Sequence, residues 1–259
     1  RGAKVIAEDI NPAVEKLARP GLVPLLADIT EDGAAERAAG LAIEHFGRLD
    51  ILVNNAGIII NKRVVDMSRE DWERIQAVNA TAAFLHCREA VKAMMPNRSG
   101  AIVNIASYAS YFAFPTIAAY TASKGALAQL TRTLALEGRK NNVLVNAIAP
   151  TGGTRMTEGL IPPQVFEQLK PELVSPLVVY LASEQCQETS GLFEVGGGWM
   201  GKVRWERSLG VGFDPKAGFD AEDVAAQWQQ ICNFENAAHP ADNMEALKEM
   251  MANLQKYAG

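Results

Sequence analysis

Ser107, Tyr120 and Lys124 are the residues of this sequence whose types and spacing are best suited to chemistry. They lie in SYASYFAFPTIAAYTASK with the spacing S-x12-Y-x3-K. Tyr120 and Lys124 are four residues apart at the start of a predicted helix, so they share one helix face. Ser107 ends a predicted strand, and the carboxyl ends of parallel strands line the ligand crevice of an α/β protein. We therefore expect the three side chains to meet.

The chemistry that such a trio supports is proton exchange with an oxygen atom. A free phenol has a pKa of about 10, too high for a base near neutrality. A neighbouring ammonium group favours the phenolate, and a serine hydroxyl can hold the same substrate oxygen. This combination suits reversible alcohol–ketone redox in which a cofactor carries the hydride. The alternative is structural, because Y-x3-K alone is common and Tyr and Lys often flank a helix start.

Composition narrows the classes of partner. The chain has 259 residues, of which 48% are hydrophobic and 21% charged, with a net charge of −5. The acidic balance and the lack of a basic stripe argue against a nucleic-acid partner. No apolar run approaches the ~20 residues that span a bilayer, so we expect no membrane partner. The histidines are far apart and predict no metal site. The three scattered cysteines favour reduced thiols and a cytoplasmic protein.

Apolar segments of strand length alternate with helical patterns along the first 200 residues. This alternation predicts an α/β domain with a parallel sheet covered by helices on both faces. Residues 201–259 lack such strands, and we expect them to form a helical C-terminal extension. The expected strands are 4–9, 22–28, 50–57, 101–107, 142–150 and 192–198, and the main expected helices are 32–46, 68–95 and 119–139.

Four motifs together resemble the short-chain dehydrogenase/reductase family. They are NNAG (54–57), the Ser/Tyr/Lys trio, VNAIAP (145–150) and the aspartate that ends KVIAED. The resemblance covers roughly residues 1–200 and implies a Rossmann-type doubly wound parallel sheet with a nicotinamide cofactor.

The resemblance also assigns roles to four residues. It implies that Tyr120 is the general acid/base and that Ser107 orients the substrate oxygen. It implies that Lys124 lowers the phenol pKa and binds the nicotinamide ribose. Asn79, in QAVNAT, matches an asparagine that holds a proton-relay water. The alternative for Asn79 is a polar group that binds backbone within a kinked helix.

The cofactor residues also come from the resemblance, and they favour NAD. A carboxylate at Asp9 accepts hydrogen bonds from a ribose 2′-OH and repels a 2′-phosphate, so we expect NAD over NADP. The alternative is a merely solvated strand end. Many relatives have Pro-Gly after the strand that ends at Pro150, whereas Thr151 replaces that glycine here. The sequence therefore does not assign the residue that binds the carboxamide of the nicotinamide. The expected cofactor residues are Asp9, Ile10, Asp28, Ile29, Asn55, Ala56, Gly57, Tyr120, Lys124, Pro150, Gly153 and Thr154.

One element of the family pattern has no counterpart in this sequence. In the family a first strand and a Gly-rich turn (T-G-x3-G-x-G) precede the segment resembling RGAKVIAEDI. The glycines of VGGGWMG (195–201) open no helix and are expected to form a turn at the sheet edge. The first strand is central in the order 3-2-1-4-5-6, and unpaired buried backbone groups cost about 1–3 kcal/mol each. We therefore expect the native protein to contain this unit and the chain alone to bind NAD poorly; direct pairing of strands 4–9 and 50–54 would refute this.

The second half of the sequence narrows the substrate. The segments ELVSPLVVYLAS and GLFEVGGGW resemble the (3R)-hydroxyacyl-CoA dehydrogenase domain of peroxisomal multifunctional enzymes and their bacterial relatives. A 3-hydroxyacyl thioester is the expected small-molecule substrate. The alternatives are a hydroxysteroid, sugar or oxoacyl-carrier-protein substrate, or a catalytically silent scaffold. The family resemblance implies subunit contacts through the expected helices 68–95 and 119–139, and hence a homodimer or homotetramer. Trp205 and Trp228 either line a substrate channel or anchor the extension by packing.

Overall fold

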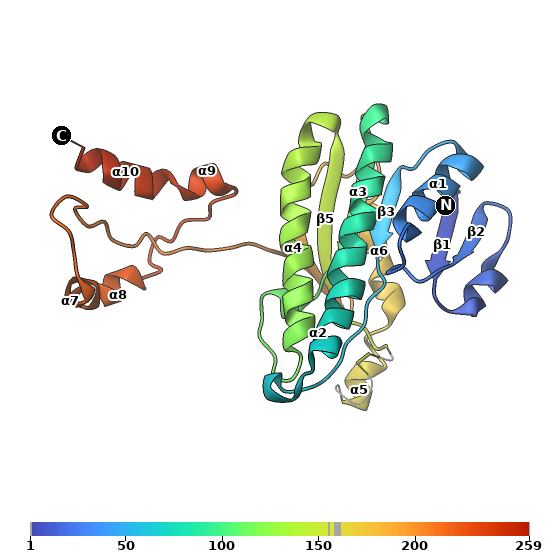
Figure 1. Ribbon diagram of the computed structural model, residues 1–259, viewed down its shortest axis with the longest axis horizontal. Coiled ribbons are helices and arrows are strands. Elements are labelled where there is room, and N and C mark those ends of the chain that lie inside the picture. The colour runs from blue at the N-terminus through green and yellow to red at the C-terminus, as the bar shows by residue number, and fades with distance from the viewer. Residues whose placement is uncertain (1, 155, 158–161, 259) are drawn as a thin grey trace. The chain divides into compact units, whose positions relative to one another are not determined.

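The computed structural model describes residues 2–154, 156–157 and 162–258, in two compact units (Figure 1). The first unit extends to Lys202 and the second is Val203–Gly259, close to the predicted boundary after residue 200.

The main sheet of the first unit has the strand order β3-β4-β5-β6-β7. Pairing between β3 and β4, β4 and β5, and β5 and β6 is parallel. Two glycines with positive φ, Gly197 and Gly198, form the two-residue turn between β6 and β7, as such a hairpin requires. The strands are β3 (Ile51–Asn54), β4 (Gly100–Ile105), β5 (Val143–Pro150), β6 (Leu192–Gly196) and β7 (Trp199–Val203).

Helices cover both faces of this sheet, which confirms the predicted doubly wound α/β class. On one face, α3 (Ala82–Met94) and α4 (Ala118–Gly138) pack Cys87, Met94 and Ala135 against Ile102 and Val145. On the other face, α6 (Ser175–Leu181) packs against the opposite side chains of β4 and β5. These strands are apolar on both sides because helices bury both sides.

The expected helix 68–95 is interrupted. Ser68 begins α2 (Arg69–Gln76) with a capping box: its side chain accepts from the Asp71 N–H, and Asp71 accepts from the Ser68 N–H. A π-helical turn at Ala77–Thr81 then separates α2 from α3. The segment after the first strand is a 3-10 helix at Pro12–Leu17. The remaining helices of this unit are α1 (Ala34–Phe46) and α5 (Pro163–Phe166).

The first two strands form a separate sheet. β1 (Val5–Asp9) and β2 (Leu22–Leu26) pair in parallel with each other, and in the described residues neither pairs with β3. Ile51 and Val53 of β3 remain 42% and 40% exposed, unlike the buried residues of β4 and β5. β1 and β3 are therefore not paired directly. Such pairing was the observation that would have refuted the hypothesis of a missing central strand.

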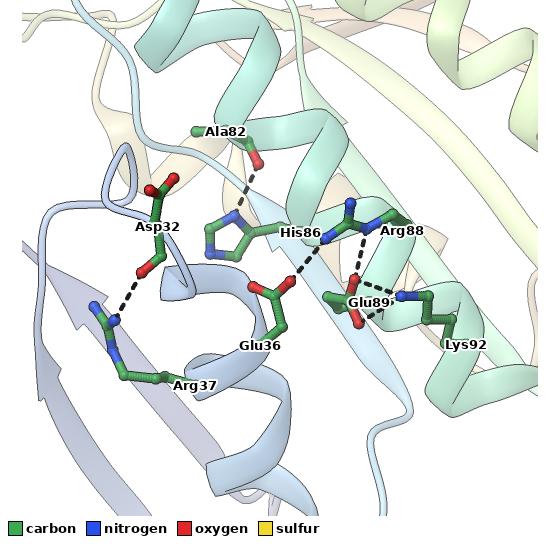
Figure 2. Close-up of polar contacts among 8 residues, drawn as sticks. All are labelled: Asp32, Glu36, Arg37, Ala82, His86, Arg88, Glu89 and Lys92. Atoms are coloured by element: carbon green, nitrogen blue, oxygen red, sulfur yellow. Dashed lines mark hydrogen bonds and ion pairs between the residues drawn. The ribbon is translucent and has the colours of Figure 1, made fainter.

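Side chains rather than strand pairing connect the β1–β2 sheet to the rest of the unit. His86 of α3 lies 3.0 Å from the Glu8 carboxylate of β1, and its Nδ1 lies 2.8 Å from the Ala82 carbonyl oxygen. Burial opposes protonation of His86, but these two hydrogen bonds prevail and raise its pKa. Figure 2 shows that Arg88 of α3 also reaches Glu36 of α1, 2.7 Å away. Helices α1 and α3 thus hold the small sheet.

The second unit is helical, with several short helices linked by loops. Arg207 donates to the carbonyl of Ala246 and pairs with Glu249 at 2.6 Å. Phe213 and Phe219 stack with ring centroids 4.6 Å apart. Trp205 and Trp228 are 42% and 58% exposed. The helices are α7 (Ala221–Ala226), α8 (Trp228–Ile231), α9 (Asn243–Ala246) and α10 (Lys248–Lys256).

Two kinds of feature are absent from the described residues. None of their helices has the length and apolar character needed to cross a membrane. Nor do the same residues contain a cluster of three or more His, Cys, Asp or Glu side chains arranged to hold a metal ion.

The open edge of β3 predicts a pattern of hydrogen exchange. We expect the amides of Ile51–Asn54 to exchange faster than those of β4 and β5, because one side of β3 lacks a ladder partner. Hydrogen–deuterium exchange with mass spectrometry checks this. In a longer version of the protein that adds a strand, the same amides should become as slow as those of β4. Equal protection of β3 and β4 in the 259-residue chain would contradict an open edge.

Candidate active site

The predicted trio is brought together at the carboxyl end of the main sheet. Ser107 follows β4 and caps a 3-10 turn at Tyr108–Ser110, where its side chain accepts from the Ala109 N–H. Tyr120 and Lys124 lie in the first two turns of α4. The Ser107 hydroxyl lies near enough to the Tyr120 phenol to lower its pKa, and the Lys124 ammonium lies 5.8 Å from the centre of the Tyr120 ring.

Lys124 is an unusual charge because it is almost completely buried. Only 3% of the residue is exposed, and its Nζ donates to the Ile105 carbonyl oxygen at 2.6 Å. Burial lowers the pKa of Lys124 from 10.5 to about 8. A Cβ atom added to Gly57 would lie 3.3 Å from the Asn79 Oδ1 and 3.5 Å from this Nζ, so the segment after β3 packs closely against both side chains.

The pKa of Tyr120 differs from the expected direction. Burial raises it, the Ser107 hydroxyl lowers it, and the nearby Tyr108 raises it, with a net rise. Lys124 is not among the groups that shift this pKa in the structure, so the lowering by Lys124 stays a prediction. The phenol therefore stays protonated near neutral pH, the form that donates a proton to a carbonyl oxygen.

Asn79 connects three segments around the trio. It lies in the π-helical turn, a feature often found at functional sites. Its Oδ1 accepts from the Ile58 N–H at 2.8 Å, and its Nδ2 donates to the Ile58 carbonyl and to the Ser123 hydroxyl at 2.9 and 3.1 Å. Both amide protons are thus used by the protein, which matches the backbone-binding alternative. The relay water remains a prediction.

A second buried network supports the site, and the sequence reasoning did not assign it. Asn54 of NNAG donates to Asn104 at 2.8 Å and lies 3.2 Å from the Cys87 sulfur. Asn104 donates to the Thr131 hydroxyl at 2.9 Å. Burial raises the pKa of the Cys87 thiol to about 12, so it is not a nucleophile. The signal in the sequence is an asparagine inside the apolar strand 101–105, since such a group must find buried partners.

The expected adenosine-side residues follow strands of both sheets. Asp9 is the last residue of β1, and it accepts from the Asn11 N–H at 2.8 Å beside the 66% exposed Ile10. Hydrogen bonds from the Thr30 N–H and hydroxyl lower the pKa of Asp28, so it is an ionised acceptor, and half-buried Ile29 lies between them in the chain. Asn55 and Ala56 are exposed after β3.

In the segment expected to bind the carboxamide of the nicotinamide, two backbone N–H groups already have hydrogen-bond partners within the protein. Pro150 ends β5, but the Gly153 N–H donates to the Leu169 carbonyl and the Thr154 N–H donates to the Thr157 hydroxyl. A Cβ at Gly153 would lie 2.5 Å from the Phe166 carbonyl oxygen, so this glycine is required by close packing. Carboxamide binding there remains a prediction and needs those N–H groups to be released.

The buried ammonium of Lys124 predicts a pH-dependent stability difference. Burial of the charged amine lowers the stability of the folded state. This destabilisation is fully present below pH 8 and disappears as the pH rises toward 10.5. Lys124→Met should therefore raise the free energy of unfolding at pH 7 by up to about 3 kcal/mol, less the lost hydrogen bond to Ile105. Urea unfolding at pH 7 and pH 10 measures this. The same gain at both pH values would show that the amine is not desolvated.

Comparisons with known proteins agree with this geometry. A family model described as short chain dehydrogenase matches residues 1–162. The peroxisomal multifunctional enzyme type 2 of Mus musculus is 37% identical over 270 residues, which cover 99% of this chain and 37% of the mouse protein. A short-chain type dehydrogenase/reductase of Mycobacterium tuberculosis is 36% identical over 208 residues, covering 80% of this chain and 72% of that protein.

Solved structures give the same assignment. The full-length peroxisomal multifunctional enzyme type 2 of Drosophila melanogaster has a TM-score of 0.82 at 27% identity, covering 94% of this chain and 44% of that one. A short chain dehydrogenase of Mycobacterium avium has a TM-score of 0.76 at 29% identity, covering 92% and 88%. The chain spans 37% of the mouse enzyme but 72% and 88% of the two mycobacterial proteins. On these matches, and with Ser107, Tyr120 and Lys124 together at the sheet end, this chain belongs to the short-chain dehydrogenase family.

Proposed function

We propose that this chain transfers a hydride between NAD and a secondary alcohol or its ketone, with a 3-hydroxyacyl thioester as the substrate. The observation that carries the proposal is the proximity of the Ser107 hydroxyl and the Tyr120 phenol beside the buried amine of Lys124. Two hydroxyl groups converge there at the carboxyl end of β4, where a parallel sheet binds ligands.

In this proposal each residue has a defined task. The Ser107 hydroxyl holds the substrate oxygen. Tyr120 gives a proton to that oxygen when the ketone is reduced and takes one when the alcohol is oxidised. The nicotinamide, when bound, accepts or supplies the hydride. Lys124 presents its Nζ to the ribose hydroxyls, and Asn79 keeps the Ile58 segment against α4.

The fit of a nicotinamide cofactor is supported by the strand-end residues. Gly57 lies beside the Lys124 Nζ, and Asp9 offers an exposed carboxylate at the end of β1. An aspartate at that place favours a ribose 2′-OH over a 2′-phosphate, which is the argument for NAD rather than NADP.

The substrate proposal rests on the relatives' names. Proteins of Neurospora crassa and Saccharomyces cerevisiae that are 36% and 34% identical to this chain are each named peroxisomal hydratase-dehydrogenase-epimerase. The chain covers 29% and 28% of their lengths and resembles a dehydrogenase, so we assign it the dehydrogenase step alone. A hydroxysteroid, sugar or carrier-protein substrate and a silent scaffold are the other outcomes that an assay distinguishes.

We further propose that a parallel strand completes the cofactor site between β1 and β3. Both strands have an unpaired edge in the described residues, and β3 exposes apolar side chains that a parallel sheet normally buries. A strand there would join the two sheets and its following turn would offer backbone N–H groups to the pyrophosphate. The cofactor affinity of the protein should then depend on that strand.

The compartment and the assembly are also proposals. The three free cysteines fit a reducing compartment, for which we propose the cytoplasm, although several relatives are named peroxisomal. A homodimer or homotetramer through α3 and α4 is supported by exposed apolar side chains such as Phe84 and Leu136.

Turnover measurements test the proposed reaction. A longer version of the protein that includes the proposed strand should reduce NAD with 3-hydroxyacyl-CoA faster than with hydroxysteroids or sugars. Alcohol oxidation should accelerate above pH 7, because the pKa of Tyr120 is raised and the phenolate is the base. Tyr120→Phe should lower kcat by roughly 10²- to 10⁴-fold without loss of NAD binding. Undiminished turnover by this variant would reject the assigned acid/base, and NAD binding with no turnover of any substrate would favour the scaffold.

Cofactor preference should follow the charge at position 9. Asp9→Ala combined with Ile10→Arg should raise the ratio of kcat/KM for NADP to that for NAD by roughly 10- to 100-fold, since repulsion of the 2′-phosphate is replaced by attraction. Glu15→Gln, which removes another exposed carboxylate near the end of β1, is the matched control and should leave the ratio unchanged. An unaltered ratio in the double variant would show that Asp9 does not contact the ribose.

A further inference from the structure

The segment between the two catalytic hydroxyls is an aromatic loop, residues 108–114. It begins directly after Ser107 and is followed six residues later by Tyr120. The Tyr108 and Phe114 rings pack edge to face with centroids 5.3 Å apart, and the Tyr111 and Phe112 rings do so at 4.9 Å. Phe112 and Phe114 are nevertheless 59% and 47% exposed. Large apolar groups are therefore presented beside the residues that bind the reacting oxygen.

This loop is fastened to the domain at several points. The Tyr111 hydroxyl donates to the Glu194 carboxylate of β6 at 2.7 Å. The Ala109 N–H donates to the Ser107 hydroxyl, and farther along the chain the Thr116 carbonyl accepts from the Lys62 N–H at 2.8 Å. The Tyr111–Glu194 contact spans 83 residues of sequence and is the side-chain contact that ties the loop to β6.

The Tyr111–Glu194 pair is suited to a hydrogen bond that stays formed. Burial and the hydrogen bond to Glu194 both raise the pKa of Tyr111, so the phenol keeps the proton that it donates. Neither residue has a role in the proposed proton transfer. The pair therefore holds the loop without entering the chemistry.

We propose that Phe112 and Phe114 receive the apolar chain of the substrate and that Tyr111 is a positioning residue that holds them there through Glu194. The inference rests on the proposed function. Tyr108 of this loop lies near Tyr120 and packs against Phe114, so the loop borders the place where the substrate oxygen is proposed to bind. The exposed rings of Phe112 and Phe114 suit the alkyl substituent rather than the polar thioester.

Chain length is the variable that tests this assignment. Each buried methylene adds about 0.8 kcal/mol to the binding free energy, a factor of roughly four in affinity. If Phe112 and Phe114 contact the alkyl chain, the affinity should therefore increase steeply with chain length. The affinities of butanoyl-CoA, octanoyl-CoA and hexadecanoyl-CoA are measured by calorimetry, and kcat and KM are measured with the matching 3-hydroxyacyl-CoA series. The wild-type protein should bind the longer chains more tightly.

Two sets of variants distinguish the role of Phe112 and Phe114 from that of Tyr111 and Glu194. Phe112→Ala/Phe114→Ala should reduce the ratio of long-chain to short-chain affinity at least tenfold, whereas Phe234→Ala, which truncates a similarly exposed ring in the second unit, should not. Tyr111→Phe should raise KM for the long chain severalfold with kcat for the short chain unchanged. Glu194→Gln keeps an oxygen acceptor and should retain most of the selectivity, and Tyr180→Phe is the control for loss of an exposed phenol.

The affinity measurements with acyl-CoA distinguish failure of this inference from failure of the proposed function. Chain-length selectivity that survives in the double Phe variant, or a wild-type protein that binds long and short chains equally, would overturn the inference. Selective binding of long chains that disappears in the double variant, with no turnover of any 3-hydroxyacyl-CoA, would support the loop assignment and reject the reaction. Equal loss with Tyr111→Phe and Tyr180→Phe would show that Tyr111 has no positioning role.

Discussion

The burial of one lysine amine is the constraint on which the site depends. Lys124 is held behind Tyr120 with its Nζ on the Ile105 carbonyl, where water cannot stabilise its charge. An amine in that position costs folding free energy and is useful only if a ligand or a phenolate shares its charge. The protein therefore carries a local instability at the end of β4, in a place where a ribose or a developing negative charge would relieve it.

Buried amides make that arrangement possible. Asn79 joins the segment after β3 to α4, and Asn54 with Asn104 joins β3 to β4 and α4. Their hydrogen-bonding groups are largely matched, so the polar interior rigidifies the site instead of weakening it. The π-helical turn that contains Asn79 is the local irregularity that directs its amide toward Ile58. The positions of Ser107, Tyr120 and Lys124 thus depend on buried amides as well as on the strand and helix that carry them.

The division of the sheet affects the two halves of the site differently. Ser107, Tyr120 and Lys124 belong to the intact five-stranded sheet and its helix α4, so their geometry is formed within the described residues. Asp9 and Asp28 follow the two-stranded sheet, which α1, α3 and the Glu8–His86 contact hold in place. Cofactor binding is therefore the part of the proposed function that is most sensitive to how the two sheets are joined.

The sequence alone determined the order of the main strands and helices, the family and the meeting of Ser107, Tyr120 and Lys124, because periodicity, strand-end position and the S-x12-Y-x3-K spacing are local properties. It did not determine the interruption of the 68–95 helix at Asn79, the direction of the Tyr120 pKa, the occupied N–H groups of Gly153 and Thr154, or the tie from Tyr111 to Glu194. These depend on burial and on contacts between residues far apart in the chain. Desolvation and hydrogen-bond competition are decided only when the packed neighbours are in place, which is why tertiary structure was needed to see them.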